Sequence, residues 1–225
     1  MKAPHTLLIA MLALCCIACG NKTRDDRDDR DEYDDTEEYL ADTDIDLYLV
    51  AGDEARPVIA ALAATYPQLS EMILPNNASS FSATVKKKYF PAVDSLLSTP
   101  AAAQIIGNDL KAAWCRNSIN GDVGSDLYLI HTPAIFRPSG PVHVSFKEAD
   151  NYDPYEAIDV RLVDEDARTW ATVTRNNIGR QLAIMIGGEI ISAPVVQSEI
   201  LGGHISITGY GIRNLFEKMT SKKPD

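Results

Sequence analysis

The feature that most constrains the fold is a pair of apolar runs separated by two glycines. Residues 182–186 read Leu-Ala-Ile-Met-Ile and residues 189–193 read Glu-Ile-Ile-Ser-Ala, with Gly187 and Gly188 between them. Glycine adopts positive φ without steric cost, so two glycines between β-forming runs favour a tight antiparallel hairpin. Pro194 follows the second run and lacks the N–H that a sheet ladder needs. The sequence therefore predicts a β-hairpin over 182–193.

The segments around this hairpin show the periods of both strands and helices. Apolar runs with a period of two residues predict strands over 45–50, 69–74, 110–114, 126–130, 142–146, 158–163 and 205–207. Helical spacing between proline or glycine boundaries predicts helices over 57–66, 89–97, 164–176 and 212–219. We therefore expect an α+β fold, a mixed or antiparallel sheet with β-hairpins packed against helices.

The helix predicted over 164–176 has signals at both ends. Asp164 is expected to be its N-cap, and Gly179 is expected to stop it in a left-handed conformation. Its buried stripe is expected to comprise Ala167, Trp170, Ala171 and Thr174. This helix and the following hairpin form the best-defined part of the predicted fold.

Two of the predicted strands share a sequence pattern. Residues 46–50 read Asp-Leu-Tyr-Leu-Val, and residues 126–130 read Asp-Leu-Tyr-Leu-Ile. Five residues are too few to establish an internal repeat, so two related halves remain an open alternative.

The first residues have the pattern of an export signal. Lys2 precedes an uncharged apolar run over 7–18, which is well short of the ~20 residues that span a bilayer. The run ends in Cys16-Ile17-Ala18-Cys19-Gly20 and resembles the lipobox of bacterial lipoproteins, in which the cysteine is lipidated and the chain is cut before it. We expect a signal peptide over 1–18 and acyl chains such as palmitate on Cys19. An ordinary signal peptide cleaved near Ala18 is the alternative.

An acidic segment follows the cysteine. Residues 20–46 carry thirteen Asp or Glu against four Lys or Arg, a net charge of −9 out of −11 for the chain. Such a segment buries too little apolar surface to offset its ordering entropy. We therefore expect residues 19–46 to be a lipidated cysteine followed by a disordered acidic linker. The near-neutral remainder has no basic patch, so nucleic-acid binding is not expected.

The segment from Ile158 to Gly209 resembles the head of the first periplasmic domain, P1, of SecD, a membrane subunit that assists protein export. The resemblance runs through the residues Thr174, Asn177, Gly179, Leu182-Ala183-Ile184, Gly188, Ser192-Ala193-Pro194, Ile200, Gly202-Gly203, Ile207 and Gly209. It implies a SecD or SecDF P1 head-like part over 126–225, preceded by an N-terminal α/β part over 47–125. Members of this family also have transmembrane helices that harvest a proton gradient, and we expect none here.

The sequence offers no catalytic constellation. His131, His143 and His204 do not stand at metal-ligand spacing with another ligand, and Ser192 and Ser198 lack a nucleophile elbow. Cys115 is the single cysteine of the body, so no internal disulfide is expected and a buried, inert thiol is favoured. We expect no enzyme activity, no metal and no cofactor.

The resemblance implies a binding function in the cell envelope. We expect a non-catalytic, lipid-anchored module that binds unfolded or envelope polypeptide in connection with protein export or envelope assembly. Exposed apolar groups near the hairpins are the candidate contacts, namely Ile190, Val195, Val196 and Ile200, unless all four belong to the core. Anchoring is expected at the outer membrane, on its periplasmic face or at the cell surface. The alternative is a surface-exposed structural or adhesive lipoprotein that binds glycan or host protein.

Overall fold

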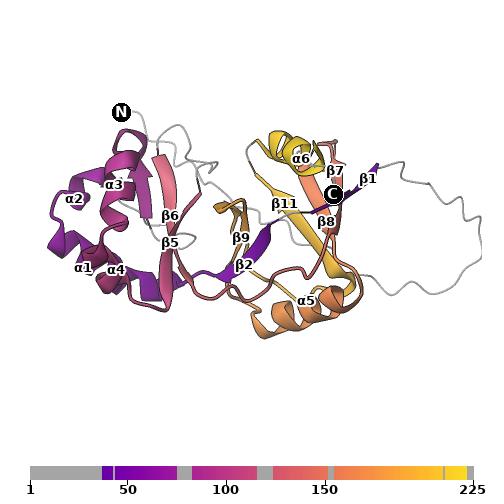
Figure 1. Ribbon diagram of the computed structural model, residues 1–225, viewed down its shortest axis with the longest axis horizontal. Helices are drawn as coiled ribbons and strands as arrows, with labels where there is room; N and C mark the ends of the chain where they lie inside the picture. The colour runs from indigo at the N-terminus through magenta and orange to yellow at the C-terminus, as the bar shows by residue number, and fades with distance from the viewer. Residues whose placement is uncertain are drawn as a thin grey trace, which may run out of the picture. The chain divides into compact units, whose positions relative to one another are not determined.

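The computed structural model describes residues 37–42, 44–74, 83–115, 124–151, 155–209 and 211–221. The predicted signal peptide over 1–18, the lipidated Cys19 and the linker up to residue 36 lie outside the described residues. The described part is an α+β fold with three antiparallel sheets, as the sequence predicts (Figure 1). None of its helices is both long enough and apolar enough to cross a membrane.

The first sheet has the strand order β1-β7-β8-β11. Its strands are β1 (Glu38–Ala41), β7 (Val142–Lys147), β8 (Ala157–Arg161) and β11 (His204–Thr208). Side chains alternate between two faces, so Val144, Val160 and Ile205 are buried on one face while the side chains between them face away. The buried face packs in one core with α5 (Asp164–Asn176) and α6 (Ile212–Ser221).

The second sheet contains the predicted hairpin and has the order β10-β9-β2. Its strands are β2 (Ile45–Leu49), β9 (Leu182–Ile186) and β10 (Glu189–Ser192). Gly187 and Gly188 have φ of +60° and +84°, which confirms the turn. The sheet is buried on both sides, because Leu182 and Ile184 pack with the first sheet while Ala183 packs with the third.

The third sheet has the order β3-β4-β6-β5. Its strands are β3 (Ile73–Leu74), β4 (Ala83–Lys86), β5 (Leu110–Cys115) and β6 (Gly124–His131). The helices that share its core are α1 (Ala55–Thr65), α2 (Leu69–Met72), α3 (Phe90–Leu97) and α4 (Pro100–Ile106). Gly124 is required where β6 meets β4, since a Cβ there would lie 2.3 Å from the Val85 carbonyl oxygen.

The predicted division of the chain is wrong at two places. The boundary at residue 126 falls inside β6, which pairs with β4 and β5 of the preceding part. The linker predicted through residue 46 also extends too far, because β1 pairs with β7 and β2 pairs with β9. Ala41 and Ile45 are fully buried, so the last residues of the acidic segment belong to the folded part of the chain.

Two local predictions also need correction, and two elements were not predicted. Residues 69–74, predicted as one strand, form α2 followed by the two-residue strand β3. The N-cap position of α5 belongs to the extended Val163, and Asp164 is the first helical residue with φ of +46°. Strand β4 and helix α4 were not predicted, although Thr99 caps α4 by accepting a hydrogen bond from the Ala102 N–H at 3.2 Å.

The two similar sequence patterns occupy β2 and β6. The strands meet at an antiparallel bridge between Val50 and Ile130, and Tyr48 and Tyr128 pack in one cluster. The two strands with the repeated pattern therefore lie next to each other, and their contact connects the second sheet with the third.

Candidate functional site

The structure separates the four predicted contact residues. Ile190 and Val196 are buried, with 1% and 7% of their surface exposed, so the prediction that they are exposed contacts is wrong. Ile190, in β10, packs between the second and third sheets, and Val196 lies in the core that includes the first sheet. Ile200 is half-buried against that core, whereas Val195 is 45% exposed. Val195 is therefore the most accessible of the predicted contacts.

The segment that carries Val195 is held firmly by backbone hydrogen bonds. The Gly179 N–H donates to the Val196 carbonyl at 2.8 Å, and the Val196 N–H donates to the Arg180 carbonyl at 2.9 Å. Two residues after Arg180, the Leu182 N–H donates to the Pro194 carbonyl at 2.9 Å. We call residues 193–203 the head loop. These bonds fix the start of the head loop against the chain that leaves α5.

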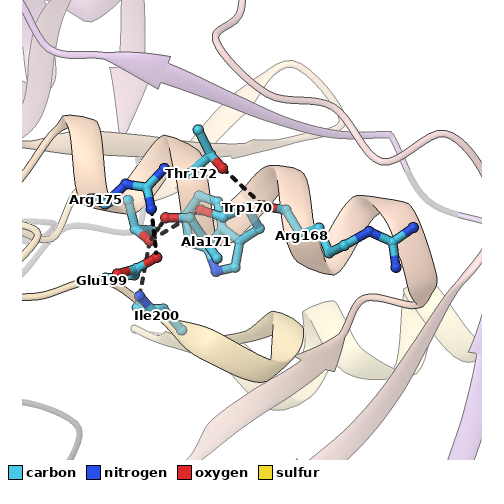
Figure 2. Close-up of polar contacts among 8 residues, drawn as sticks. Arg168, Trp170, Ala171, Thr172, Arg175, Glu199 and Ile200 are labelled. Atoms are coloured by element: carbon cyan, nitrogen blue, oxygen red, sulfur yellow. Dashed lines mark hydrogen bonds and ion pairs between the residues drawn. The ribbon is translucent and has the colours of Figure 1, made fainter.

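The end of the head loop is fixed by side chains of α5. Thr174 is fully buried, and its hydroxyl accepts a hydrogen bond from the Ile200 N–H at 2.9 Å while donating to the Trp170 carbonyl at 3.0 Å. Figure 2 shows Ile200 beside α5, together with the ion pair between Arg175 and Glu199, in which Nη1 and Oε1 are 3.5 Å apart. The Trp170 indole N–H donates to the His204 carbonyl at 3.1 Å, where the loop passes into β11. A buried hydroxyl and an indole thus hold the loop in one position.

Large apolar side chains are exposed on these rigid segments. Ile178, Val195 and Leu201 are 52%, 45% and 73% exposed, and we call these three residues together the α5-end surface. Ile178 and Val195 lie beside the end of α5, whereas Leu201 belongs to the turn Leu201–Gly203, which packs along the same helix. Such groups are candidates for contact with an apolar partner. Ile178 and Leu201 were not among the predicted contact residues. Each precedes a glycine of positive φ, Gly179 or Gly202, but this is not a usable signal, because Ile106 and Ile186 also precede such glycines and are buried.

The residues considered for metal binding or catalysis lie apart from one another in the described part of the chain. No group of three or more His, Cys, Asp or Glu that could hold a metal ion occurs in the part of the chain that the structure covers. His143 and His204 are brought to either side of Arg161 by the register of the first sheet, while His131 lies in the third sheet. Cys115 is buried. These placements bring together no nucleophile, base and orienting group.

Comparison with known families identifies the part of the chain that carries this surface. Residues 142–214 match the family model described as SecDF, P1 head subdomain. This segment therefore is a SecDF P1 head-like subdomain, as the motif from Ile158 to Gly209 predicts. It begins at β7, ends within α6 and includes all of the α5-end surface. Strands β1 and β2, which complete the first and second sheets, come from outside it.

Individual relatives show the same local similarity. Protein translocase subunit SecD of Sebaldella termitidis is 56% identical over 52 residues, which cover 23% of this chain and 13% of that protein. SecD of Rhodothermus marinus is 28% identical over 127 residues, covering 54% of this chain and 20% of the relative. SecDF of Thermus thermophilus is 38% identical over 52 residues, or 7% of its length. The chain thus spans only a small part of the length of the relatives that it matches, about an eighth of the first one.

Solved structures of SecDF are also similar to this chain, at a low level. A crystal structure of SecDF in the super-membrane-facing form has a TM-score of 0.35 at 14% identity, covering 80% of this chain and 22% of that one. A second SecDF structure has a TM-score of 0.33 at 17% identity and covers 78% of this chain and 91% of that chain. These scores do not by themselves establish a common fold, so the assignment of the head-like subdomain rests on the sequence match.

Proposed function

We propose that this chain is a non-catalytic, lipid-anchored module of the cell envelope that binds polypeptide through the α5-end surface of its head-like subdomain. The role lies in protein export or envelope assembly. Support comes from the relatives of the subdomain, which are named protein translocase subunits. The anchor rests on the lipobox-like sequence around Cys19. We place the module at the outer membrane.

One observation supports the choice of surface above the others. Leu201 is 73% exposed although the backbone on both sides of it is fixed, by Thr174 at Ile200 and by Trp170 at His204. Full burial of a leucine side chain stabilises a complex by roughly 1.5–3 kcal/mol. Because the loop is already ordered, little of this gain is lost to immobilising it. A rigid, exposed apolar side chain suits repeated, weak contact with unfolded segments.

Photocrosslinking tests the proposal directly. A benzophenone amino acid is placed singly at Val195 or Leu201, and the full chain is irradiated with reduced, carboxymethylated α-lactalbumin as the unfolded probe. The control position is Thr172, which is exposed on the same helix and whose hydroxyl donates only to the Arg168 carbonyl. We expect adducts at Val195 and Leu201 well above those at Thr172. Equal yields at all three positions would count against a role for this surface.

A further inference from the structure

Strand β1 is a separate addition to the head-like subdomain. It lies outside the matched residues 142–214, yet it forms one edge of their sheet by pairing with β7 (Figure 1). Its four residues pair with Val142–Ser145, four of the six residues of β7. The segment that leads into it is the acidic stretch that follows Cys19. The strand nearest the predicted anchor therefore covers the edge of β7.

The interactions that hold β1 in place are few. Only Ala41 is fully buried, whereas Tyr39 and Leu40 are 37% and 49% exposed. Tyr39 packs edge-on against Phe216 of α6, with ring centroids 5.7 Å apart. A strand with one buried side chain out of four gains little from apolar burial.

Charge contacts add a second, weak attachment. A carboxylate oxygen of Glu38 lies 2.6 Å from the Arg161 guanidinium and 3.3 Å from Nδ1 of His143. All three side chains are at least a third exposed, and exposed ion pairs contribute little to stability. The polar contacts of β1 are thus open to competition from water, salt or another carboxylate.

We propose that β1 is an exchangeable strand, and that the edge of β7 which it covers takes up an extended segment of polypeptide in its place. This inference rests on the proposed function and identifies a docking mode for the same partner. Pairing to a sheet edge uses backbone hydrogen bonds, so it accepts many sequences. An attached strand competes at a high effective concentration, and exchange therefore requires that its own contacts be weak, as they are for β1.

The present contacts of β1 also define the segment that would replace it. The position of Glu38 favours an acidic side chain because Arg161 and His143 are beside it. The position of Tyr39 favours an aromatic side chain against Phe216, and the position of Ala41 requires a small apolar one because no surface is exposed there. The position of Leu40 is open to most residues. The preferred segment is acidic, aromatic, any residue, then small and apolar.

A reversible lock on β1 tests the exchange within one protein. Leu40 and His143 are cross-strand partners, so the double substitution Leu40→Cys and His143→Cys permits a disulfide that ties β1 to β7. The probe is a fluorescent peptide with the sequence of residues 37–42, and a second peptide with Lys for Glu and Ser for Tyr is the control. Mass spectrometry verifies the disulfide between positions 40 and 143. We expect the reduced protein to bind the first peptide at least tenfold more tightly than the oxidised protein.

A weakened strand gives a second measurement in the protein without added cysteines. The double variant Glu38→Gln and Tyr39→Ala removes the carboxylate and the aromatic contact of β1 but leaves its pairing with β7 and the buried Ala41. We expect this variant to bind the peptide about fivefold more tightly than the unaltered chain. Glu148→Gln is the matched control, because Glu148 is an exposed carboxylate paired with Arg213 elsewhere on this subdomain. Equal affinity of the oxidised and reduced proteins would overturn the exchange. If the oxidised and reduced proteins bound the peptide equally while α-lactalbumin still formed adducts at Leu201, only the strand exchange would be overturned. The proposed function would then still stand.

Discussion

Thr174 is the residue whose replacement tests the head loop most sharply. Its hydroxyl is fully buried and accepts from the Ile200 N–H at 2.9 Å. Thr174→Val keeps the shape of the side chain but removes the acceptor, so the Ile200 N–H loses its partner. Leaving a buried donor unsatisfied costs roughly 1–3 kcal/mol. We therefore expect the free energy of unfolding to fall by about that amount, with the head loop the first segment to loosen.

The same helix provides a matched control for this substitution. Thr172 is exposed, and its hydroxyl donates to the Arg168 carbonyl at 3.2 Å, so Thr172→Val removes a comparable bond to the helix backbone without orphaning a donor. Urea unfolding of both variants gives the difference in stability, and hydrogen exchange at the Ile200 amide reports on the loop. If Thr174→Val and Thr172→Val had equal stability and equal exchange at Ile200, the buried hydroxyl would not hold the loop.

Three further predictions address the third sheet, the charge balance and the anchor. Gly124→Ala is expected to destabilise the protein by ~1–3 kcal/mol, because the added Cβ would lie 2.3 Å from a carbonyl oxygen of β4. The control is Gly140→Ala, whose Cβ would meet no atom within 4 Å and which is expected to leave thermal unfolding unchanged. The hydrogen bonds from Arg137 lower the pKa of Asp46 in the folded protein. The ionised Asp46 therefore stabilises the fold above the ordinary carboxyl pKa of about 4, and this stabilisation is lost as the pH falls through the lowered pKa. For Asp46→Asn we expect the free energy of unfolding to depend less on pH between about pH 5 and pH 2 than it does for the unaltered chain. An unchanged pH dependence would contradict the pairing of Asp46 with Arg137. Cys19→Ser is expected to abolish incorporation of labelled palmitate in cells, and retained label would place the lipid elsewhere.

The local features of the fold could be predicted from the sequence because short-range rules determine them. The β9–β10 hairpin follows from Gly187 and Gly188, and the end of α5 follows from Gly179, whose φ is +81°. The alternating pattern of β7, β8 and β11 likewise reports the burial of one face. These elements lie in the head-like subdomain, where the family resemblance also applied.

Pairings between strands far apart in the sequence could not be predicted from such short-range rules. Nothing in the acidic segment indicates that Glu38 pairs with Ser145, more than a hundred residues away, so β1 was interpreted as linker. The accessibility of the contact residues also depends on distant packing. Ile190 is buried by β5 and β6 of the third sheet, while a register shift between Ile190 and Ser192 interrupts the alternation of β10. Exposure in a hairpin therefore could not be deduced from apolar character alone.

The binding affinity of the α5-end surface for unfolded polypeptide tests the central claim most directly. Fluorescence anisotropy with labelled, carboxymethylated α-lactalbumin compares the unaltered chain with the double variant Val195→Ser and Leu201→Ser. Tyr155→Ser is the control, because Tyr155 is 63% exposed before the start of β8, whereas the head loop meets the end of that strand, where His204 pairs with Arg161. We predict at least a tenfold loss of affinity for the double variant and less than a twofold change for the control. Equal affinity of all three proteins would contradict polypeptide binding at this surface.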